Sequence, residues 1–281
     1  MIKQLIKDLK EIKLAIFDLD GVIYRGDKLF PTVDKIIQDL KELSIRVVYN
    51  SNNSTATRQM YVDRLKKYNI DSKISDFYTS ASITASEITK LERNSKIFVI
   101  GEIGLREELE AMGHTIVSNE SQFDEIDFVI VGLDRKFNYK DIAFAQKSIL
   151  KGKAQFYATN NDATLPIADG LLPGAGVMVK AIEICTSIKP IKIFGKPDPC
   201  GINSILNEKK VSPNEAAIFG DRLDTDILAG NRANIKTVLV MTGVTTYKMV
   251  EELKIQESQA KSIDKNLFPD VIIENLNKIF I

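Results

Sequence analysis

The chain has 281 residues, a formal net charge of zero, 7% aromatic residues and no tryptophan. A length of this order allows one large domain or two modest ones. The balanced charge gives no reason to expect a polyanion or a membrane surface as partner, and the scarcity of aromatic side chains argues against a nucleic-acid stacking platform. Any anion that the chain binds must therefore be recognised locally.

Residues that commonly bind transition metals or form disulfides are scarce. The two cysteines, Cys185 and Cys200, are too few and too unpatterned for a disulfide framework or a zinc site. The single histidine, His114, follows Ala111-Met112-Gly113, where a helix is expected to end, so we expect a surface residue rather than a catalyst. Proton transfer in an enzyme of this composition would fall to carboxylates, lysine or tyrosine.

No segment reads as a targeting signal or a membrane span. The first residues alternate charged and aliphatic side chains and include Asp8 and Glu11, whereas a secretory signal needs an uninterrupted apolar stretch and a transit peptide avoids acids. No apolar run approaches membrane-spanning length. We therefore expect a soluble, cytoplasmic protein with neither a membrane nor a nucleic acid as its partner.

Short apolar runs alternate with helix-period stretches along the whole chain. The predicted strands are Leu14–Phe17, Arg46–Tyr49, Ile97–Ile100, Phe128–Val131, Gln155–Ala158, Ile191–Phe194, Ala216–Phe219 and Thr237–Val240. The predicted amphipathic helices are Val33–Leu43, Thr57–Tyr68, Leu105–Ala111, Tyr139–Leu150 and Val177–Cys185. Strands separated by helices of this length indicate parallel sheets built from βαβ units, so the predicted fold class is α/β.

The first predicted strand ends in acidic residues. Asp18 and Asp20 are separated by one residue, and Gly21 follows them. Because side chains alternate along a strand, both carboxylates can point the same way. Ligands of open α/β folds bind at the carboxyl edge of the sheet, where these acids would lie. The alternative is a solvated turn, in which Asp and Gly are common.

Polar residues also follow two later predicted strands. Ser51-Asn52-Asn53-Ser54-Thr55 can donate to an anion together with a helix N-terminus, although the same residues suit an N-cap and a polar loop. Lys196 lies in Gly195-Lys196-Pro197-Asp198-Pro199, after the predicted strand Ile191–Phe194. A stiff loop there suits a fixed positive charge near a phosphate; the alternative is a surface lysine in a turn.

The predicted strand Ala216–Phe219 is followed by a group of acids, Asp221, Asp224 and Asp226. Complementing the dipole of the next helix explains one or two of them, but not all. If they converge with Asp18 and Asp20, each like-charge pair costs on the order of 4 kcal/mol at about 4 Å and an effective dielectric of about 20. Such a cluster calls for a divalent cation, and all-oxygen ligands favour Mg²⁺.

Together these four strand ends offer carboxylates, a hydroxyl and amide loop and a lysine, a set typical of phosphoryl transfer. One aspartate could attack phosphorus, while another protonates the leaving oxygen and then deprotonates water. The motifs occupy residues 18–54 and 195–226, whereas residues 83–184 carry none. We therefore predict a discontinuous core domain, residues 1–82 plus 185–281, with an inserted α/β domain at residues 83–184.

In order along the chain, four segments resemble the motifs of the haloacid dehalogenase-like hydrolase superfamily: Asp18-Leu19-Asp20-Gly21-Val22, Ser51-Asn52-Asn53-Ser54, Gly195-Lys196-Pro197, and Gly220-Asp221 with Asp226. Further segments resemble its NagD-like and 4-nitrophenylphosphatase branch: Tyr24-Arg25-Gly26, Gly132-Leu133-Asp134-Arg135, Ala158-Thr159-Asn160 and Pro173-Gly174-Ala175-Gly176. The resemblance covers nearly the whole chain. It implies a Rossmann-like parallel-sheet core with an inserted α/β cap of the type called C2.

The resemblance also implies an activity. Its members of this kind are Mg²⁺-dependent phosphatases that hydrolyse small phosphomonoesters, such as sugar phosphates, nucleotides or phosphoglycolate, through an aspartyl-phosphate. By this resemblance Asp18 is the nucleophile and Asp20 the general acid and base. Ser51, Asn52 and Lys196 would bind the phosphate.

The same resemblance implies a set of magnesium ligands. These are the Asp18 carboxylate, the Asp20 backbone carbonyl and the Asp221 carboxylate. Asp226 would orient a metal-bound water from outside the ligand set. Asp224 has no implied role, and a helix cap is its simplest interpretation.

The inserted segment departs from the related sequences at one loop. They usually read Asn-Pro-Asp where this chain has Asn160-Asn161-Asp162. We interpret Asp134, Arg135, Asn160, Asn161 and Asp162 as candidates for substrate selectivity; the alternative is ordinary loop polarity. A small phosphorylated metabolite is the expected partner, and the resemblance adds a homodimer formed through the cap.

Three other classes of protein use similar parts. A phospho-acceptor regulatory domain also has an aspartate, Mg²⁺, a hydroxyl and a lysine, but needs neither a second aspartate at the spacing of Asp20 nor an insertion. A dehalogenase would dispense with Mg²⁺ and Asp20, and a phosphomutase usually carries a small helical cap, for which the stretch from Asp18 to Ser51 is too short. A non-catalytic binding protein on the same fold is the third alternative.

Overall fold

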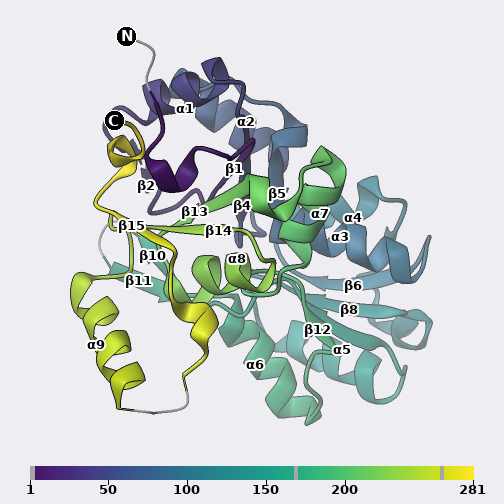
Figure 1. Ribbon diagram of the computed structural model, residues 1–281. Helices are drawn as coiled ribbons and strands as arrows, with labels where there is room; N and C mark the ends of the chain where they lie inside the picture. Colours follow the sequence, from purple (N-terminus) through teal and green to yellow (C-terminus); the bar gives the residue numbers. More distant parts are fainter. Residues whose placement is uncertain (1–3, 168–169, 260–262) are drawn as a thin grey trace. The chain divides into compact units, whose positions relative to one another are not determined.

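The computed structural model describes residues 4–167, 170–259 and 263–281 (Figure 1). Within these residues the chain divides into two compact units. The core unit takes the described residues of Met1–Ser51, Val62–Phe77 and Lys196–Ile281, and the second unit takes those of Asn52–Tyr61 and Tyr78–Gly195. The predicted inserted domain was residues 83–184. The second unit is larger, because it also includes Asn52–Tyr61, begins its main part at Tyr78 and extends to Gly195.

The core unit is built around a sheet that, in the described residues, has six strands in the order β15-β14-β13-β1-β4-β5. Its strands are β1 (Leu14–Phe17), β4 (Arg46–Ser51), β5 (Phe77–Thr79), β13 (Ala216–Gly220), β14 (Lys236–Val240) and β15 (Val271–Ile273). β1 pairs in parallel with β13 and β4, and every residue of β1 is buried. A fully buried apolar strand is typical of the middle of a parallel sheet that is covered on both faces.

The register of β1 brings several strand ends to one edge of this sheet. Phe17 lies opposite Phe219 of β13 and Tyr49 of β4. The next residues of these three strands therefore leave the sheet at the same edge. Asp18 follows β1 directly, and Asp221 follows β13 directly.

The helices of the core unit are α1 (Val33–Glu42), α7 (Cys200–Lys209), α8 (Leu228–Arg232), α9 (Tyr247–Ser258) and the end of α2 (Arg58–Lys67). α1 is amphipathic, because Val33, Ile36, Ile37 and Leu40 recur at helical spacing and all four are buried. A short hairpin of β2 (Tyr24–Arg25) and β3 (Lys28–Leu29) follows β1.

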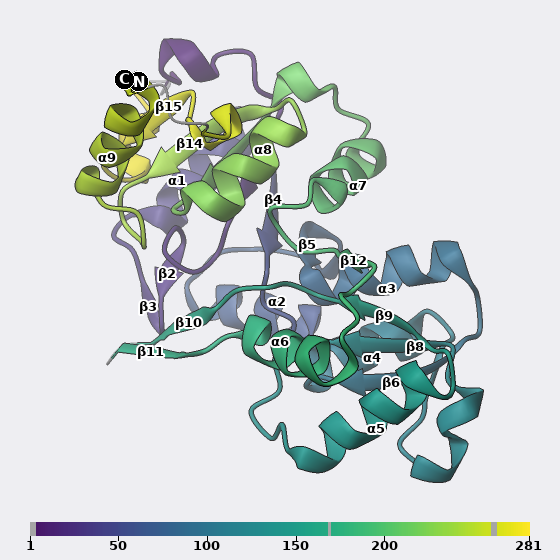
Figure 2. The same cartoon turned by 90° about the horizontal axis from the view of Figure 1, so that it is seen from below.

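The second unit has a parallel sheet of its own (Figure 2). In its described residues this sheet has five strands in the order β12-β9-β8-β6-β7. They are β6 (Lys96–Ile100), β7 (Thr115–Ile116), β8 (Phe128–Val131), β9 (Gln155–Ala158) and β12 (Lys192–Ile193). The helices of this unit are α3 (Ser80–Leu91), α4 (Ile103–Ala111), α5 (Tyr139–Leu150) and α6 (Ala175–Thr186), and its hairpin is β10 (Thr164–Ile167) with β11 (Gly170–Pro173).

An apolar core joins this sheet to two of its helices. Phe98 of β6, Phe144 of α5 and Ile182 of α6 belong to one buried cluster. The rings of Phe98 and Phe144 lie 4.4 Å apart, centroid to centroid. The predicted α/β class with parallel sheets is therefore confirmed, and both units follow it.

Short helical turns complete the described chain. They are the 3₁₀ helices η1 (Lys7–Leu9), η2 (Ile74–Asp76), η3 (Glu120–Glu125), η4 (Pro213–Glu215), η6 (Lys265–Leu267) and η7 (Leu276–Ile279), and the π-helix η5 (Leu223–Ile227). None of the described helices combines the length and the apolar character that crossing a bilayer requires.

One predicted strand belongs to a different sheet from the expected one. β12, inside the predicted strand Ile191–Phe194, pairs with β9 of the second unit. Lys196 does follow this strand, as predicted, but the strand was expected in the core domain and belongs to the second sheet. Lys196 is the first residue of the core unit after the chain leaves the second unit. A short apolar run fits the interior of either sheet, so its own residues do not specify its partners.

The expected surface position of His114 is also wrong. His114 is buried, with 4% of its surface exposed. Its Nδ1 accepts a hydrogen bond from the backbone N–H of Ser95 at 3.2 Å, and its Nε2 lies 2.9 Å from Thr89 Oγ1. These partners satisfy both ring nitrogens, which makes burial of the neutral ring tolerable.

Candidate active site

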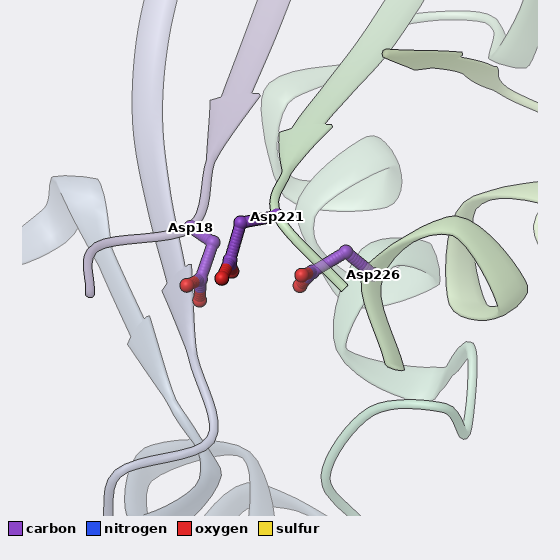
Figure 3. Close-up of side chains that lie close together, drawn as sticks. All are labelled: Asp18, Asp221 and Asp226. Atoms are coloured by element: carbon purple, nitrogen blue, oxygen red, sulfur yellow. The ribbon is translucent and has the colours of Figure 1, made fainter. Parts of the chain in front are cut away.

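Three carboxylates meet at the carboxyl edge of the core sheet. Among the described residues, one oxygen each of Asp18, Asp221 and Asp226 lies within 4.8 Å of the others (Figure 3). Asp221 and Asp226 are only 2% and 1% exposed. The first comes directly after β13 and the second lies in η5, so consecutive elements deliver them to the end of β1.

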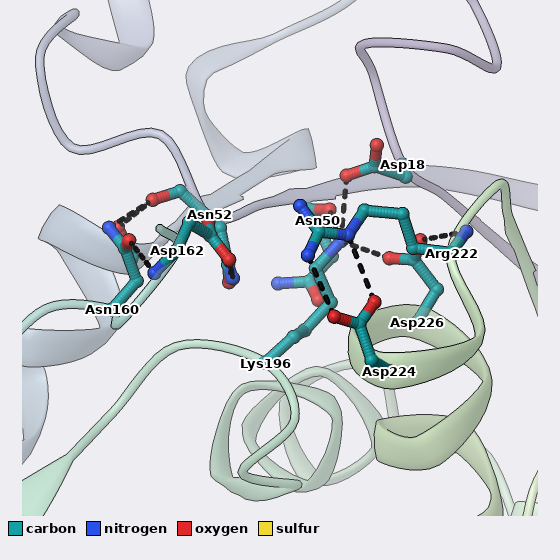
Figure 4. A network of polar contacts seen from close by, with 10 residues as sticks. Asp18, Asn50, Asn52, Asn160, Asp162, Lys196, Arg222, Asp224 and Asp226 are labelled. Carbon is teal, nitrogen blue, oxygen red and sulfur yellow. Dashed lines mark hydrogen bonds and ion pairs between the residues drawn. The ribbon is translucent and has the colours of Figure 1, made fainter. Parts of the chain in front are cut away.

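Lys196 lies inside this cluster (Figure 4). Its Nζ donates to Asp18 Oδ1 at 2.7 Å, to Asp226 Oδ1 at 2.6 Å and to the backbone oxygen of Asn50 at 2.9 Å. These contacts use all three donors of an ammonium group. Burial alone would lower the pKa of Lys196, but the charges of Asp18 and Asp226 outweigh it and raise the pKa, so the lysine is charged.

Burial and mutual repulsion raise the pKa values of the clustered acids. Burial raises the pKa of Asp18 well above its usual range; Lys196 opposes this rise, and the charges of Asp226 and Asp221 add to it. Burial and the charge of Asp226 raise the pKa of Asp221 to about 7. One lysine therefore leaves the cluster with more negative charge than it can neutralise.

This donor set fits a magnesium ion. The cluster offers carboxylate oxygens and, within the described residues, neither histidine nor cysteine joins it. Hard divalent cations prefer such oxygen ligands, and a cation would offset the repulsion that raises the pKa of Asp18 and Asp221.

Two glycines allow chain segments to pack directly on Asp221. A Cβ at Gly21, whose φ is +88°, would lie 2.6 Å from Asp221 Oδ2, and one at Gly243 would lie 1.8 Å from the same atom. The backbone N–H of Val244 donates to Asp221 Oδ2 at 2.6 Å. The loop after β14 therefore holds Asp221. Our sequence analysis missed this loop, although Thr242-Gly243 after the predicted strand Thr237–Val240 is the signal that could have revealed it.

Asp226 and Asp224 differ in their surroundings. The backbone N–H of Arg222 donates to Asp226 Oδ2 at 3.1 Å. The guanidinium of Arg222 donates to both oxygens of Asp224, at 3.0 and 2.8 Å, and Asp224 is exposed. The sequence favoured a helix cap for Asp224. Asp224 instead pairs with the side chain of Arg222, and η5 has no side-chain hydrogen bond at its N-cap.

Asp20 and Ser51 lie in the core unit as well. Nearby protein atoms desolvate the Asp20 carboxyl and raise its pKa to about 6, against the opposing charge of Arg64, although the residue keeps an exposed surface. A carboxyl group with this pKa can both give and take a proton near neutral pH. Ser51 is the last residue of β4 and is buried.

Asn52 belongs to a hydrogen-bond network of the second unit (Figure 4). Its Nδ2 donates to both oxygens of Asp162, at 3.3 and 3.1 Å, and its backbone oxygen accepts from Asn160 Nδ2 at 2.8 Å and from Ser80 Oγ at 2.5 Å. Asn160 is buried, whereas Asn161 is exposed. Two of the selectivity candidates, Asn160 and Asp162, thus hold Asn52.

Two further selectivity candidates, Arg135 and Asp134, form local contacts. Arg135 donates from its backbone N–H, at 3.1 Å, and from its side chain to the carboxylate of Glu102. Asp134 Oδ1 accepts from the backbone N–H of Lys136 at 2.8 Å. The Arg135 side chain is 62% exposed, whereas Asp134 is only partly exposed, so Arg135 is the more accessible of the two.

Comparison with known proteins agrees with these features. A model of haloacid dehalogenase-like hydrolases matches residues 15–115, and a related hydrolase-like model matches residues 193–268. An acid sugar phosphatase from Staphylococcus haemolyticus is 34% identical over 96% of this chain and 98% of its own length.

Solved structures are similar over the same extent. A 4-nitrophenylphosphatase from Thermotoga maritima is 34% identical with a TM-score of 0.85, covering 96% of this chain and 97% of that one. A glycerol phosphate phosphatase from Mycobacterium tuberculosis, solved in complex with magnesium, is 26% identical with a TM-score of 0.84, covering 99% and 79%. The chain belongs to the haloacid dehalogenase-like hydrolases.

Proposed function

We propose that this protein is a Mg²⁺-dependent phosphatase that hydrolyses small phosphomonoesters through an aspartyl-phosphate on Asp18. The observation that carries this proposal is the buried cluster of Asp18, Asp221 and Asp226 around the ammonium group of Lys196. The acids alone would repel a phosphate dianion. With Lys196 and a bound cation, the same site becomes attractive to it.

The first chemical step uses Asp18 and Asp20. A carboxylate oxygen of Asp18 attacks phosphorus while the bond from phosphorus to the leaving oxygen breaks. Asp20 gives its proton to that oxygen, so that the product leaves as an alcohol. Lys196 orients Asp18 through the contact at Oδ1 and faces the negative charge of the phosphoryl group.

The second step reverses the role of Asp20. Its carboxylate takes a proton from a water molecule, whose oxygen attacks phosphorus as the bond to Asp18 breaks. Inorganic phosphate and the free carboxylate of Asp18 result. The pKa of about 6 for Asp20 suits a group that must act as an acid and then as a base.

The residues that would hold Mg²⁺ are Asp18, the backbone carbonyl of Asp20 and Asp221, with Asp226 outside the ligand set. When bound, the ion supplies positive charge to the phosphoryl oxygens. The residues that we propose to bind the phosphate are Ser51, Asn52 and Lys196.

We further propose sugar phosphates and similar small metabolites as the substrate class. The relatives described above are named acid sugar phosphatase, 4-nitrophenylphosphatase and glycerol phosphate phosphatase. We propose the second unit as the cap, with Asp134, Arg135 and Asn161 as selectivity residues. A panel of phosphorylated metabolites, assayed with Mg²⁺ and with a chelator, would identify the preferred substrate.

Substituting Asp18 is the most direct test. Asp18→Asn should lower hydrolysis of 4-nitrophenyl phosphate on the order of 10⁴-fold or more, because the nucleophile is lost. Asp224→Asn is the matched control, since this exposed carboxylate pairs with the Arg222 side chain and is not one of the three clustered acids. Equal turnover by Asp18→Asn and Asp224→Asn would refute the proposal.

A trapping experiment separates a phosphatase from a phospho-acceptor domain. Asp20→Asn should accumulate phosphate on the peptide that contains Asp18, because 4-nitrophenolate leaves without an acid but water then lacks its base. The wild type should release phosphate over many turnovers. A single equivalent of phosphate bound by the wild type, without turnover, would favour the regulatory domain.

A further inference from the structure

The loop that carries Asp20 closes tightly on itself. The backbone N–H of Gly21 donates to the oxygen of Tyr24 at 2.8 Å, and the N–H of Tyr24 donates to the oxygen of Leu19 at 3.2 Å. Asp20 and Tyr24 also form an isolated β-bridge. The position of Tyr24 therefore determines where the Asp20 backbone lies.

Arg64, near the end of α2, holds this loop at Tyr24. The guanidinium carbon of Arg64 lies 3.8 Å from the centre of the Tyr24 ring. The same group donates to the backbone oxygen of Gly26 and lies 3.3 Å from Asp27 Oδ1. One turn later Tyr68 Oη donates to the backbone oxygen of Asp27 at 2.8 Å. All of these residues belong to the core unit.

The loop is held at a second point by the segment after β14. Thr242 Oγ1 donates to the backbone oxygen of Gly21 at 2.6 Å, and Arg25 donates to the backbone oxygen of Thr242. Gly21 in turn packs on the carboxylate of Asp221. Thr242 therefore constrains the Gly21 end of the loop and Arg64 constrains the Tyr24 end, with Asp20 next to both.

We propose that Arg64 is a positioning residue for Asp20, and this inference rests on the proposed function. A planar guanidinium can stack on an aromatic face and donate in its own plane at the same time, whereas a lysine ammonium cannot do both. Through Tyr24 this contact keeps Asp20 where a leaving oxygen can accept its proton. A displacement of about 1 Å at such a group costs on the order of 10²-fold in rate.

The test compares two phosphate esters. For Arg64→Ala we expect kcat/KM with glycerol phosphate to fall about tenfold to a hundredfold, because an alkoxide needs the acid. With 4-nitrophenyl phosphate we expect kcat/KM to fall about threefold or less, since that phenolate leaves unprotonated. The comparison uses kcat/KM because kcat also includes hydrolysis of the aspartyl-phosphate, in which Asp20 is the base for both esters. Mg²⁺ affinity should stay close to that of the wild type. Tyr68→Phe, a milder change, should shift the ratio of the two kcat/KM values in the same direction.

The controls separate positioning from general destabilisation. Arg46→Ala removes another arginine of the core unit that donates to a backbone oxygen, that of Lys209, and it should leave the ratio of kcat/KM values unchanged. Arg64→Lys should keep most of the defect. Equal losses of kcat/KM on both esters, or full recovery with Arg64→Lys, would overturn the inference, whereas a wild type that hydrolyses neither ester would overturn the proposed function itself.

Discussion

The two units arrange their charged side chains differently. In the core unit, Asp18, Asp221 and Asp226 cluster around a single ammonium group, that of Lys196, which pairs with Asp18 and Asp226. In the second unit, two arginines each pair with one glutamate: Arg58 donates to both oxygens of Glu108, at 2.6 and 2.8 Å, and Arg135 pairs with Glu102.

This difference favours the core unit as the place of the proposed chemistry. A one-to-one pair is complete without a ligand, so it contributes to folding and to the shape of a surface. A buried cluster with excess negative charge is costly unless something positive is bound. Strongly perturbed carboxylates of this kind are typical of functional sites, and in the described chain they cluster in the core unit.

The largest effect in this comparison should come from removing the lysine. Lys196→Met leaves the partly buried Asp18 and the buried Asp226 without their ammonium partner, which should lower the free energy of unfolding by about 3–5 kcal/mol in a chelator. Added Mg²⁺ should restore more stability to this variant than to the wild type. Urea denaturation with and without Mg²⁺ measures both quantities.

Lys13→Met is the matched control, because Lys13 pairs with Glu215 at the surface of the same unit, where its side chain is 66% exposed. Exposed pairs contribute little to stability, so this variant should unfold almost like the wild type. If the two lysine variants lost stability equally, the contrast between buried and exposed pairs would be wrong.

A smaller effect should follow from a methyl group at Gly243. The added Cβ of Gly243→Ala would lie 1.8 Å from Asp221 Oδ2, so the carboxylate must move. If Asp221 is the proposed Mg²⁺ ligand, this displacement should weaken Mg²⁺ binding about 10- to 100-fold. The measurement is the Mg²⁺ concentration that gives half-maximal activity and half-maximal thermal stabilisation.

Gly113→Ala in the second unit serves as the control for this variant. Gly113 has φ +89° and a Cβ there would meet Asn94 Oδ1 at 3.2 Å, so the change strains the backbone without touching the acid cluster. We expect lower stability with unchanged Mg²⁺ affinity. A weakened affinity in both variants would point to general destabilisation.

The parts of the fold that were predicted correctly carry their signal locally. The bounds of β1, β8, β9 and α5 agree with those predicted from the sequence. β1 and β8 are unbroken apolar runs, and β9 is buried after its first residue, Gln155. α5 is preceded by its N-cap, Asn138, whose side chain accepts from the N–H of Lys140 at 2.9 Å. Such signals need no knowledge of the rest of the chain.

The parts that were missed depend on distant partners. The two residues of β12 pair with β9, and nothing within the run excludes the core sheet. Gly243 is needed because Asp221, which lies in another loop, occupies the space that a Cβ at position 243 would take. Arg64 belongs to no recognisable sequence motif, because its proposed positioning role depends on the ring of Tyr24, 40 positions earlier in the chain. The sequence analysis predicted the acids of the site because several motifs at strand ends pointed to the same chemistry. The supporting contacts of Gly243 and Arg64 each depend on one residue that belongs to no motif.

The smallest effect should appear in the second unit, at its buried histidine. Burial lowers the pKa of His114 below 6.5, so the unfolded chain binds a proton more readily than the folded one. Stability should therefore be complete above about pH 6.5 to 7 and decline as the pH falls toward the lowered folded pKa. Protonation of Nδ1 would also remove the hydrogen bond that Nδ1 accepts from the N–H of Ser95, which contributes about 1 kcal/mol.

His114→Gln cannot titrate, so between pH 7 and 5 its melting temperature should fall less steeply than that of the wild type. Parallel curves for the two proteins would show that protonation of His114 does not limit the stability of this unit.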